Sequence, residues 1–279
     1  MNVIEQDTAA VTLLIPGHAA SLQLYVHGEH DRFVSRQIRE TGSWEPYETS
    51  LLMAMLGRDS VFLDVGANIG YFSILAASVV GQGGRVFAFE PDPSNLALFA
   101  ASCEINSFTS RIHTFAGGLS DRADSARLYL SEDNMGDHQI YAGAIERDSI
   151  PIELVNGSDY LQGRLGRLDL IKIDTQGSEY AVVCGLMQLL QSLSRPPRII
   201  IELTPFSLRE AGASGRQLIE LLGTLGLPFW IIDHIEHRLV ASTAQDLALW
   251  CDNVDACEGD QGFMNILVGA GLGDSPAEA

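Results

Sequence analysis

The 279-residue chain carries 36 acidic and 17 basic side chains, a net charge of −19 at pH 7, and 46% of its residues are hydrophobic. This hydrophobic content suffices for a folded core, whereas the charge opposes binding to nucleic acid or to an anionic membrane. No uncharged apolar run reaches the length of about 18 residues that a membrane span needs, and acids stand where a signal peptide has basic residues. We therefore expect a cytoplasmic protein without nucleic-acid or membrane partners. The oligomeric state stays open.

Strand-length apolar runs alternate with longer segments of helical period. The strands are expected at 60–66, 84–92, 111–121, 168–174 and 198–205, and the helices at 68–80, 93–106, 178–193 and 215–226. This alternation predicts an α/β fold with a doubly wound, mostly parallel sheet. Two strand-like runs around a polar turn in 228–242 predict a C-terminal antiparallel hairpin.

The domain organisation follows from where this pattern begins and ends. Residues 1–58 are expected to form an N-terminal extension of strand and helix on a core domain of residues 59–270, with a flexible tail at 271–279. Residues 122–158 interrupt the core pattern with short polar segments. The four cysteines are scattered, without CxxC pairs, so reduced thiols are expected.

A segment rich in small residues, VFLDVGANIGYFSILAA, covers residues 61–77. The strand ends near Asp64, the chain turns at Gly66, and a helix begins near Gly70. This turn lies at the carboxyl edge of the sheet, where open α/β sheets bind ligands. The two glycines allow the backbone to approach a bulky ligand, and Asn68 can bond within the turn or cap the helix.

Glu90 ends the next expected strand, about 25 residues after Asp64. A carboxylate at this place accepts hydrogen bonds from the two hydroxyls of a ribose. The glycine turn alone is equally consistent with a tight strand-to-helix connection. The turn and Glu90 together predict a nucleoside site.

The loop sequence DVGANIG differs from the GxGxxG of dinucleotide sites, which offer a helix N-terminus to a pyrophosphate. Asp64 would repel a pyrophosphate, but it suits the cationic amino and sulfonium groups of S-adenosyl-L-methionine. We therefore favour this cofactor, with S-adenosyl-L-homocysteine as its product. A nicotinamide-dependent oxidoreductase and a nucleoside-binding module without turnover remain as alternatives.

Four blocks resemble the FkbM-type S-adenosylmethionine-dependent methyltransferases: FLDVGANIGYFSILAA, VFAFEPDPSNLALFAASCEIN, AGGLSD and DLIKIDTQGSEYAVVCG. The similarity runs from about Trp44 to Pro205. It implies a class I methyltransferase, Rossmann-like fold and O-methylation of a hydroxyl on a sugar, glycolipid or polyketide-type secondary metabolite. It also implies that Pro91 and Asp121, which lie within these blocks, belong to the cofactor site.

Methyl transfer to an alcohol needs positioned reactants and a base for the hydroxyl proton. Asp174 ends the strand LDLIKID before a glycine turn, so we expect it to contact the cofactor and to act as the base. Lys172 shares its strand face by alternation. Glu179 is another catalytic candidate, although an acid at a helix start also suits the helix dipole.

Glu202 closes the strand 198–205 at the same edge of the sheet. Together with Asp174 it could hold Mg²⁺ or Ca²⁺, which would lower the pKa of an acceptor hydroxyl. A metal is possible here but is not favoured over a direct contact between Glu202 and the substrate.

The polar segment SEDNMGDHQIY, residues 131–141, is a candidate for acceptor recognition because loops carry specificity. His138 is a candidate base or donor to the acceptor, since imidazole titrates near neutral pH. Asn134 and Asp137 would accompany it. A solvated loop histidine is an equally good interpretation.

Two further groups complete the candidates. Trp44, Glu45 and Tyr47, in GSWEPYE, resemble the family segment that precedes the core and are expected to close over the cofactor, although core packing of Trp44 fits equally well. His234 and His237, in DHIEH, have no third metal ligand nearby in the sequence. We expect both histidines to be solvated turn residues.

Overall fold

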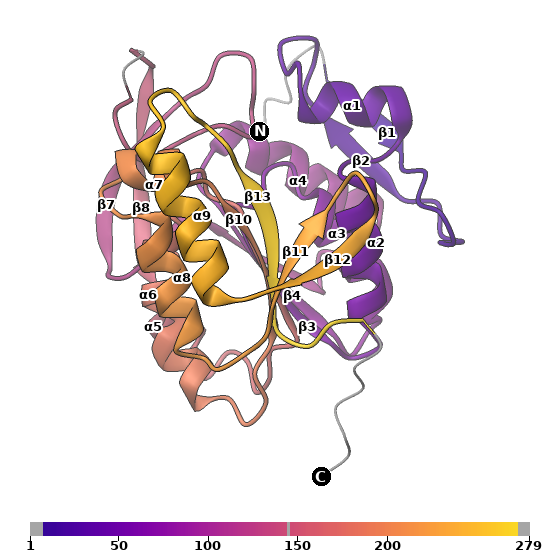
Figure 1. The fold of residues 1–279 in the computed structure, drawn as a ribbon. Helices are drawn as coiled ribbons and strands as arrows, with labels where there is room; N and C mark the ends of the chain where they lie inside the picture. The colour runs from indigo at the N-terminus through magenta and orange to yellow at the C-terminus, as the bar shows by residue number, and fades with distance from the viewer. Residues whose placement is uncertain (1–7, 144–145, 273–279) are drawn as a thin grey trace.

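A central eight-stranded sheet organises the protein in the computed structural model, which describes residues 8–143 and 146–272 (Figure 1). Its strands are β3 (Val61–Val65), β4 (Arg85–Glu90), β5 (Ile112–Ala116), β9 (Leu170–Ile173), β10 (Arg198–Leu203), β11 (Phe229–Asp233), β12 (Arg238–Ser242) and β13 (Met264–Val268). The order across the sheet is β12-β11-β13-β10-β9-β3-β4-β5, and the neighbours from β10 to β5 are parallel. The predicted doubly wound α/β fold is confirmed.

Helices cover both faces of this sheet (Figure 1). One group contains α2 (Pro46–Met55), α3 (Tyr71–Val80) and α4 (Pro93–Ile105); the other contains α5 (Gly157–Leu161), α6 (Glu179–Ser192), α7 (Pro205–Glu210), α8 (Gly215–Gly223) and α9 (Ala244–Ala256). Strand alternation divides the core, because Phe62 packs with the first group whereas Leu63 and Val65 pack with the second.

The N-terminal extension packs against α4. It contains the antiparallel strands β1 (Ala9–Thr12) and β2 (Gln23–Val26), helix α1 (Val34–Thr41), and α2. The Tyr25 N–H donates to Ser102 Oγ at 2.9 Å, and the Gln23 N–H donates to Asn106 Oδ1 at 3.0 Å. Leucines of the extension join the core of the α3 face, so this segment completes the same hydrophobic core.

A second, three-stranded sheet interrupts the core pattern after β5. It contains β6 (Gly118–Ser120), β7 (Asp124–Tyr129) and β8 (Ser149–Asn156) in the order β6-β8-β7. Strands β7 and β8 pair antiparallel within the segment whose short polar runs interrupt the core pattern. A small apolar cluster of Leu128, Ile152 and Leu154 lies on this sheet.

The C-terminal part differs from its predicted arrangement in one respect. The hairpin β11–β12 forms as expected, but β13 follows α9 and inserts between β10 and β11, antiparallel to both. The insertion of β13 depends on pairing with two distant strands, which local sequence periodicity does not reveal. Residues 273–279 of the predicted tail lie outside the described residues.

Within the described ranges, no helix combines the length and hydrophobicity that crossing a membrane requires.

Gly70 shows how tightly the start of α3 packs against α4. It adopts a left-handed φ of 86° at the start of α3, and a β-carbon there would lie 2.1 Å from the Phe99 ring. Gly226 has a comparable φ of 68° with open space around it. We expect Gly70→Ala to lower the free energy of unfolding by about 1–3 kcal/mol more than Gly226→Ala, measured by urea denaturation. Equal losses would contradict the packing role.

Candidate active site

Gly66 brings the ends of two neighbouring strands together. Its φ is 84°, and a β-carbon on it would lie 1.8 Å from the Asp174 carbonyl oxygen. The N–H groups of Gly66 and Ala67 both donate to the Phe89 carbonyl at 3.0 Å. Because only glycine fits this approach, the loop after β3 holds the ends of β4 and β9 at fixed positions.

Two cavities meet at this loop. The first, named here the Glu90 cavity, is lined by residues that include Gly66, Glu90, Pro91, Leu119, His138 and Asp174. The second, named the Glu202 cavity, is lined by residues that include Trp44, Glu45, Asn134, Lys172, Asp174 and Glu202. They share Gly66, Asn68, Gly136, Asp174 and Gln176. A molecule in one cavity can therefore approach a molecule in the other beside Asp174.

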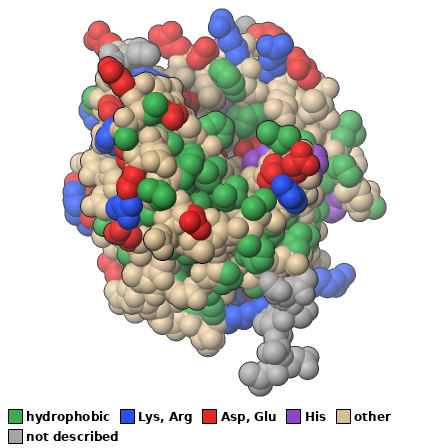
Figure 2. All heavy atoms as spheres, in the orientation of Figure 1, with side chains coloured by type: hydrophobic (Ala, Val, Ile, Leu, Met, Phe, Trp, Pro, Cys, Tyr) green, Lys and Arg blue, Asp and Glu red, His purple; other side chains and the backbone are tan. Residues whose placement is uncertain are grey.

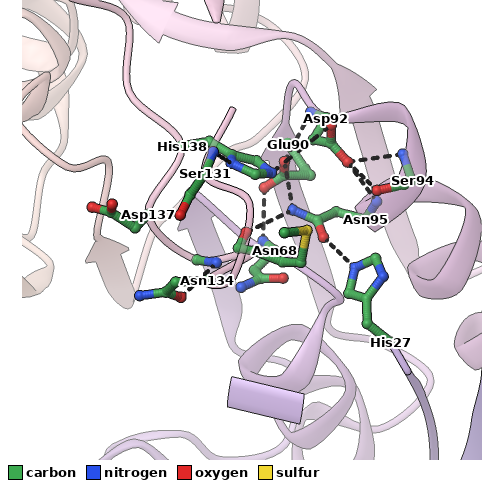
Figure 3. A network of polar contacts seen from close by, with 12 residues as sticks. His27, Asn68, Glu90, Asp92, Ser94, Asn95, Ser131, Asn134, Asp137 and His138 are labelled. Carbon is green, nitrogen blue, oxygen red and sulfur yellow. Dashed lines mark hydrogen bonds and ion pairs between the residues drawn. The ribbon is translucent and has the colours of Figure 1, made fainter. Parts of the chain in front are cut away.

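Glu90 is buried at the end of β4, and donors hold both of its carboxylate oxygens (Figure 3). Oε2 accepts the Asn68 N–H at 2.8 Å, and Oε1 accepts the Asp92 N–H at 2.8 Å. Asn95 Nδ2 also donates to Oε1, at 3.3 Å. Burial raises the pKa of Glu90 to about 7.

Asn95 ties three distant segments together around Glu90 (Figure 3). Its Oδ1 lies 2.7 Å from His27 Nε2, and its Nδ2 also donates to the Met135 carbonyl at 3.2 Å. The N-terminal extension, α4 and the 131–141 loop thus meet at one amide. Sequence reasoning missed His27 and Asn95, because neither carries a local signal of this contact.

His138 lies beside the acids at the end of β4 (Figure 3). Its Nδ1 accepts the Ser131 N–H at 3.0 Å, and its Nε2 is 4.0 Å from Asp92 Oδ2. Burial lowers the pKa of His138, which favours the neutral ring with the proton on Nε2. The lone pair that a base would use is taken by Ser131. These contacts oppose the predicted role of base and place His138 with Glu90.

Residues of the small sheet, together with Ile140 of the 131–141 loop, form the apolar wall of the Glu90 cavity. Leu119, Leu128, Ile140, Ile152 and Leu154 line it. Asp121, expected here from the sequence, lies instead on an exposed turn and pairs with Arg122 at 3.2 Å. Strand β6 carries the chain along β8 and past the cavity before Asp121 is reached.

Asp64 and Gly70 do not line either cavity, contrary to the expectation of direct cofactor contacts. Strand alternation directs Asp64 to the α3 face, where its Oδ2 accepts the Ser73 hydroxyl at 2.6 Å. Burial raises the pKa of Asp64 to about 6. Asp64 and Gly70 therefore support the loop from the α3 side, through contacts with Ser73 and Phe99.

Asp174, Gln176 and Glu202 form a polar group at the ends of β9 and β10. Gln176 Nε2 donates to Asp174 Oδ1 at 3.0 Å and to Glu202 Oε2 at 2.9 Å. Lys172 Nζ donates to Asp174 Oδ2 at 2.9 Å. The carboxyl group of Asp174 is thus fixed by a cation and an amide. Sequence reasoning named Gln176 only as a turn residue, although its place between Asp174 and Gly177 was visible.

Glu179 is fully buried behind this loop and does not line either cavity. Its Oε1 accepts the Thr175 N–H at 2.9 Å, and its Oε2 accepts the Gly177 N–H at 2.9 Å. The carboxylate of Glu179, a predicted catalytic candidate, thus holds the turn and does not face a cavity. Asn134 lines the Glu202 cavity, and its Oδ1 accepts the Gly136 N–H at 3.0 Å. Asp137 pairs with Arg147 at 2.7 Å.

Acids from α2 extend this polar group. Trp44 and Glu45 line the Glu202 cavity, and Lys172 Nζ lies 3.6 Å from Glu48 Oε1. Burial and the Glu48 charge raise the pKa of Glu45 to about 8, and burial together with Asp174 raises that of Glu202 well above its ordinary value. Several carboxylates therefore lie close to one ammonium group, that of Lys172.

The sheet order, the antiparallel strand beside β10 and an acid at the end of the second core strand define a class I methyltransferase fold. The model of the FkbM methyltransferase domain matches residues 64–228, more than half of the chain. The chain therefore belongs to the FkbM methyltransferase family, and the resemblance seen in the sequence blocks is confirmed.

The curated relatives are similar in sequence to part of this chain. The AMB antimetabolite synthetase AmbE of Pseudomonas aeruginosa is 31% identical over 201 residues, 58% of this chain and 9% of that protein. The hexuronic acid methyltransferase AglP of Haloferax volcanii is 25% identical over 174 residues, 62% of this chain and 65% of that protein. The chain thus spans less than two thirds of either relative. A solved FkbM methyltransferase from Methylobacillus flagellatus aligns with 15% identity and a TM-score of 0.46, covering 83% of this chain and 52% of that one.

Buried acids give a pH dependence that can be checked. Burial raises the pKa of Asp64 to about 6. Between about pH 4 and pH 6 the native state therefore keeps a proton on Asp64 that the unfolded state has lost. The free energy of unfolding consequently falls as the pH rises through this range. We expect Asp64→Asn, which cannot titrate, to remove about 2–3 kcal/mol of this fall, measured as the free energy of unfolding in urea. Asp159→Asn, on an exposed residue, should leave the profile unchanged.

Proposed function

We propose that the protein is an S-adenosyl-L-methionine-dependent O-methyltransferase. The observation that carries the proposal is that the Glu90 and Glu202 cavities meet at Asp174. One cavity then holds the cofactor, the other holds the acceptor, and the reacting atoms lie between them. Family membership supports the same conclusion and disfavours a nicotinamide-dependent oxidoreductase.

The residues of the Glu90 cavity fit the cofactor. Glu90 accepts from the ribose, Pro91 and the apolar wall enclose the base, and Gly66 and Asn68 approach the methionine part. Ser178 Oγ is buried at this cavity without a hydrogen-bond partner, as expected of a group that awaits a ligand. When bound, S-adenosyl-L-methionine supplies an activated methyl group and leaves as S-adenosyl-L-homocysteine.

Asp174 accepts the hydroxyl proton of the acceptor while the oxygen forms its bond to the methyl carbon. Lys172 and Gln176 hold the carboxyl group of Asp174 toward the junction of the cavities. Positioning of this kind accounts for much of the acceleration in transfer reactions. His138 and Glu179 do not take this role, because the Ser131 N–H occupies the lone pair of His138 Nδ1 and Glu179 lines neither cavity.

The acceptor is a small molecule or a glycan with a free hydroxyl, of the sugar, glycolipid or polyketide type. The name of AglP, a hexuronic acid methyltransferase, supports a sugar. Trp44, Asn134 and Glu202 line the acceptor cavity. Figure 2 shows basic side chains scattered among acidic ones on the face that it draws, which with the net charge of −19 disfavours nucleic acid.

Removal of the Glu90 carboxylate tests the cofactor site. We expect Glu90→Ala to weaken binding of S-adenosyl-L-homocysteine about 5- to 150-fold, because the ribose hydroxyls lose a buried acceptor. Titration calorimetry measures this change. Asp121→Ala is the matched control, since the structure places that acid outside the cavity. Unchanged affinity in Glu90→Ala would sink the assignment.

Neutralisation of Asp174 tests the chemistry. Asp174→Asn keeps the side-chain shape, so cofactor affinity should be retained. The rate at which the enzyme methylates its acceptor should fall about 10²- to 10⁴-fold. Mass spectrometry of the product, showing the gain of one methyl group, measures turnover. Asp159→Asn should behave like the unsubstituted enzyme. Cofactor binding without methylation of any acceptor by the unsubstituted enzyme would favour the nucleoside-binding module instead.

A further inference from the structure

A cluster of polar side chains lies where α2, the β11–β12 turn and β13 meet. We call it the Glu48 cluster, and its members are Glu45, Glu48, His234 and Asn265. One oxygen of each glutamate and one ring nitrogen of the histidine lie within 4.8 Å of one another. His234 lies in the β11–β12 turn, as expected, with its side chain 36% exposed, and its Nε2 lies 3.9 Å from Glu48 Oε2. His237 stacks on Tyr47 instead.

The three candidate ligand atoms surround the Asn265 amide nitrogen. The Asn265 amide nitrogen lies 2.7 Å from Glu48 Oε2. It lies 3.4 Å from Glu45 Oε1 and 3.3 Å from His234 Nε2. Metal–ligand bonds of about 2.1 Å separate neighbouring ligand atoms by about 3.0 Å in an octahedron and about 3.4 Å in a tetrahedron. His234 Nε2 lies 3.9 Å from Glu48 Oε2, so a bound cation would draw these ligand atoms somewhat closer together.

Buried oxygens of the cluster lack hydrogen-bond partners. Asn265 is buried, and its Oδ1 has no hydrogen-bond partner. Its Nδ2 carries two hydrogens but faces three acceptor atoms. Glu45 Oε2 and Glu48 Oε1 also lack a hydrogen-bond partner, although Lys172 lies 3.6 Å from the latter. Half a turn of the Asn265 amide would direct Oδ1 at the same three atoms. Buried acceptors without donors are costly, and a cation would satisfy them.

The charges of the side chains around Lys172 also favour a bound cation. Glu45, Glu48, Asp174 and Glu202 carry four negative charges when ionised, and Lys172 is the ammonium group among them. A divalent cation would bring this group of side chains close to neutrality. Lys172 contacts Oε1 of Glu48, whereas Oε2 faces the cluster and accepts from Asn265 Nδ2 at 2.7 Å.

We propose that the Glu48 cluster binds one divalent first-row cation of the Mn²⁺ or Zn²⁺ type. Imidazole favours such metals, whereas Mg²⁺ and Ca²⁺ prefer shells of oxygen atoms. The sequence had suggested Asp174 and Glu202 as possible ligands, but Gln176 already bridges those two acids. Because Glu45 also lines the Glu202 cavity, the cation lies where it can bind an acceptor oxygen and lower the pKa of its hydroxyl. That last role rests on the proposed function, whereas the binding of the cation does not.

Titration of the chelator-treated full chain with Mn²⁺, followed by electron paramagnetic resonance, tests the site. We expect one saturable Mn²⁺ per chain and at least tenfold weaker binding in both His234→Ala and Glu45→Gln. His237→Ala is the matched control, because it removes an imidazole from the same turn outside the cluster, and it should bind as the unsubstituted chain does. Absence of saturable binding, or equal binding in His234→Ala and His237→Ala, overturns the proposal.

Affinity for S-adenosyl-L-homocysteine, measured on the same samples, separates this proposal from the proposed function. Normal cofactor affinity without Mn²⁺ binding overturns the metal site alone. Mn²⁺ binding that depends on His234, together with no cofactor affinity, supports the metal site and overturns the proposed function alone.

Discussion

The close approach of Gly66 to the Asp174 carbonyl is the constraint on which the rest of the site depends. A residue with a side chain at position 66 would collide with the backbone after β9, so the two strand ends could not lie side by side. The same loop donates two N–H groups to the end of β4. One turn of small residues thereby fixes the positions of Glu90 and Asp174, which act on different parts of the proposed reaction.

Buried charge is the second theme of the site. The α3 face of the sheet holds Lys172 with acids from α2, β9 and β10, and ionising all of these acids in a region with little water is costly. The raised pKa values of Glu45 and Glu202 reflect that cost. Such a region favours a bound cation or a transferable proton, and both suit the activation of a hydroxyl group.

Segments that are distant in sequence complete the two cavities. His27 from the extension and Met135 from the 131–141 loop both contact Asn95, next to Glu90 (Figure 3). The small sheet gives the Glu90 cavity its apolar wall, and Trp44 lines the other cavity. The class I core therefore supplies Glu90, Asp174 and Glu202, whereas the added segments supply Glu45, Glu48 and much of the enclosure.

The sequence by itself determined the doubly wound sheet and placed Glu90 and Asp174 at strand ends, because hydrophobic runs and glycine turns act over a few residues. It could not decide where side chains point. Asp64 faces α3, Glu179 binds the turn behind the cavity, and Asp121 lies beyond it, since each direction depends on neighbouring strands and helices. Only the tertiary structure brought His234 to Glu48 and inserted β13 beside β10, because these contacts join segments far apart along the chain.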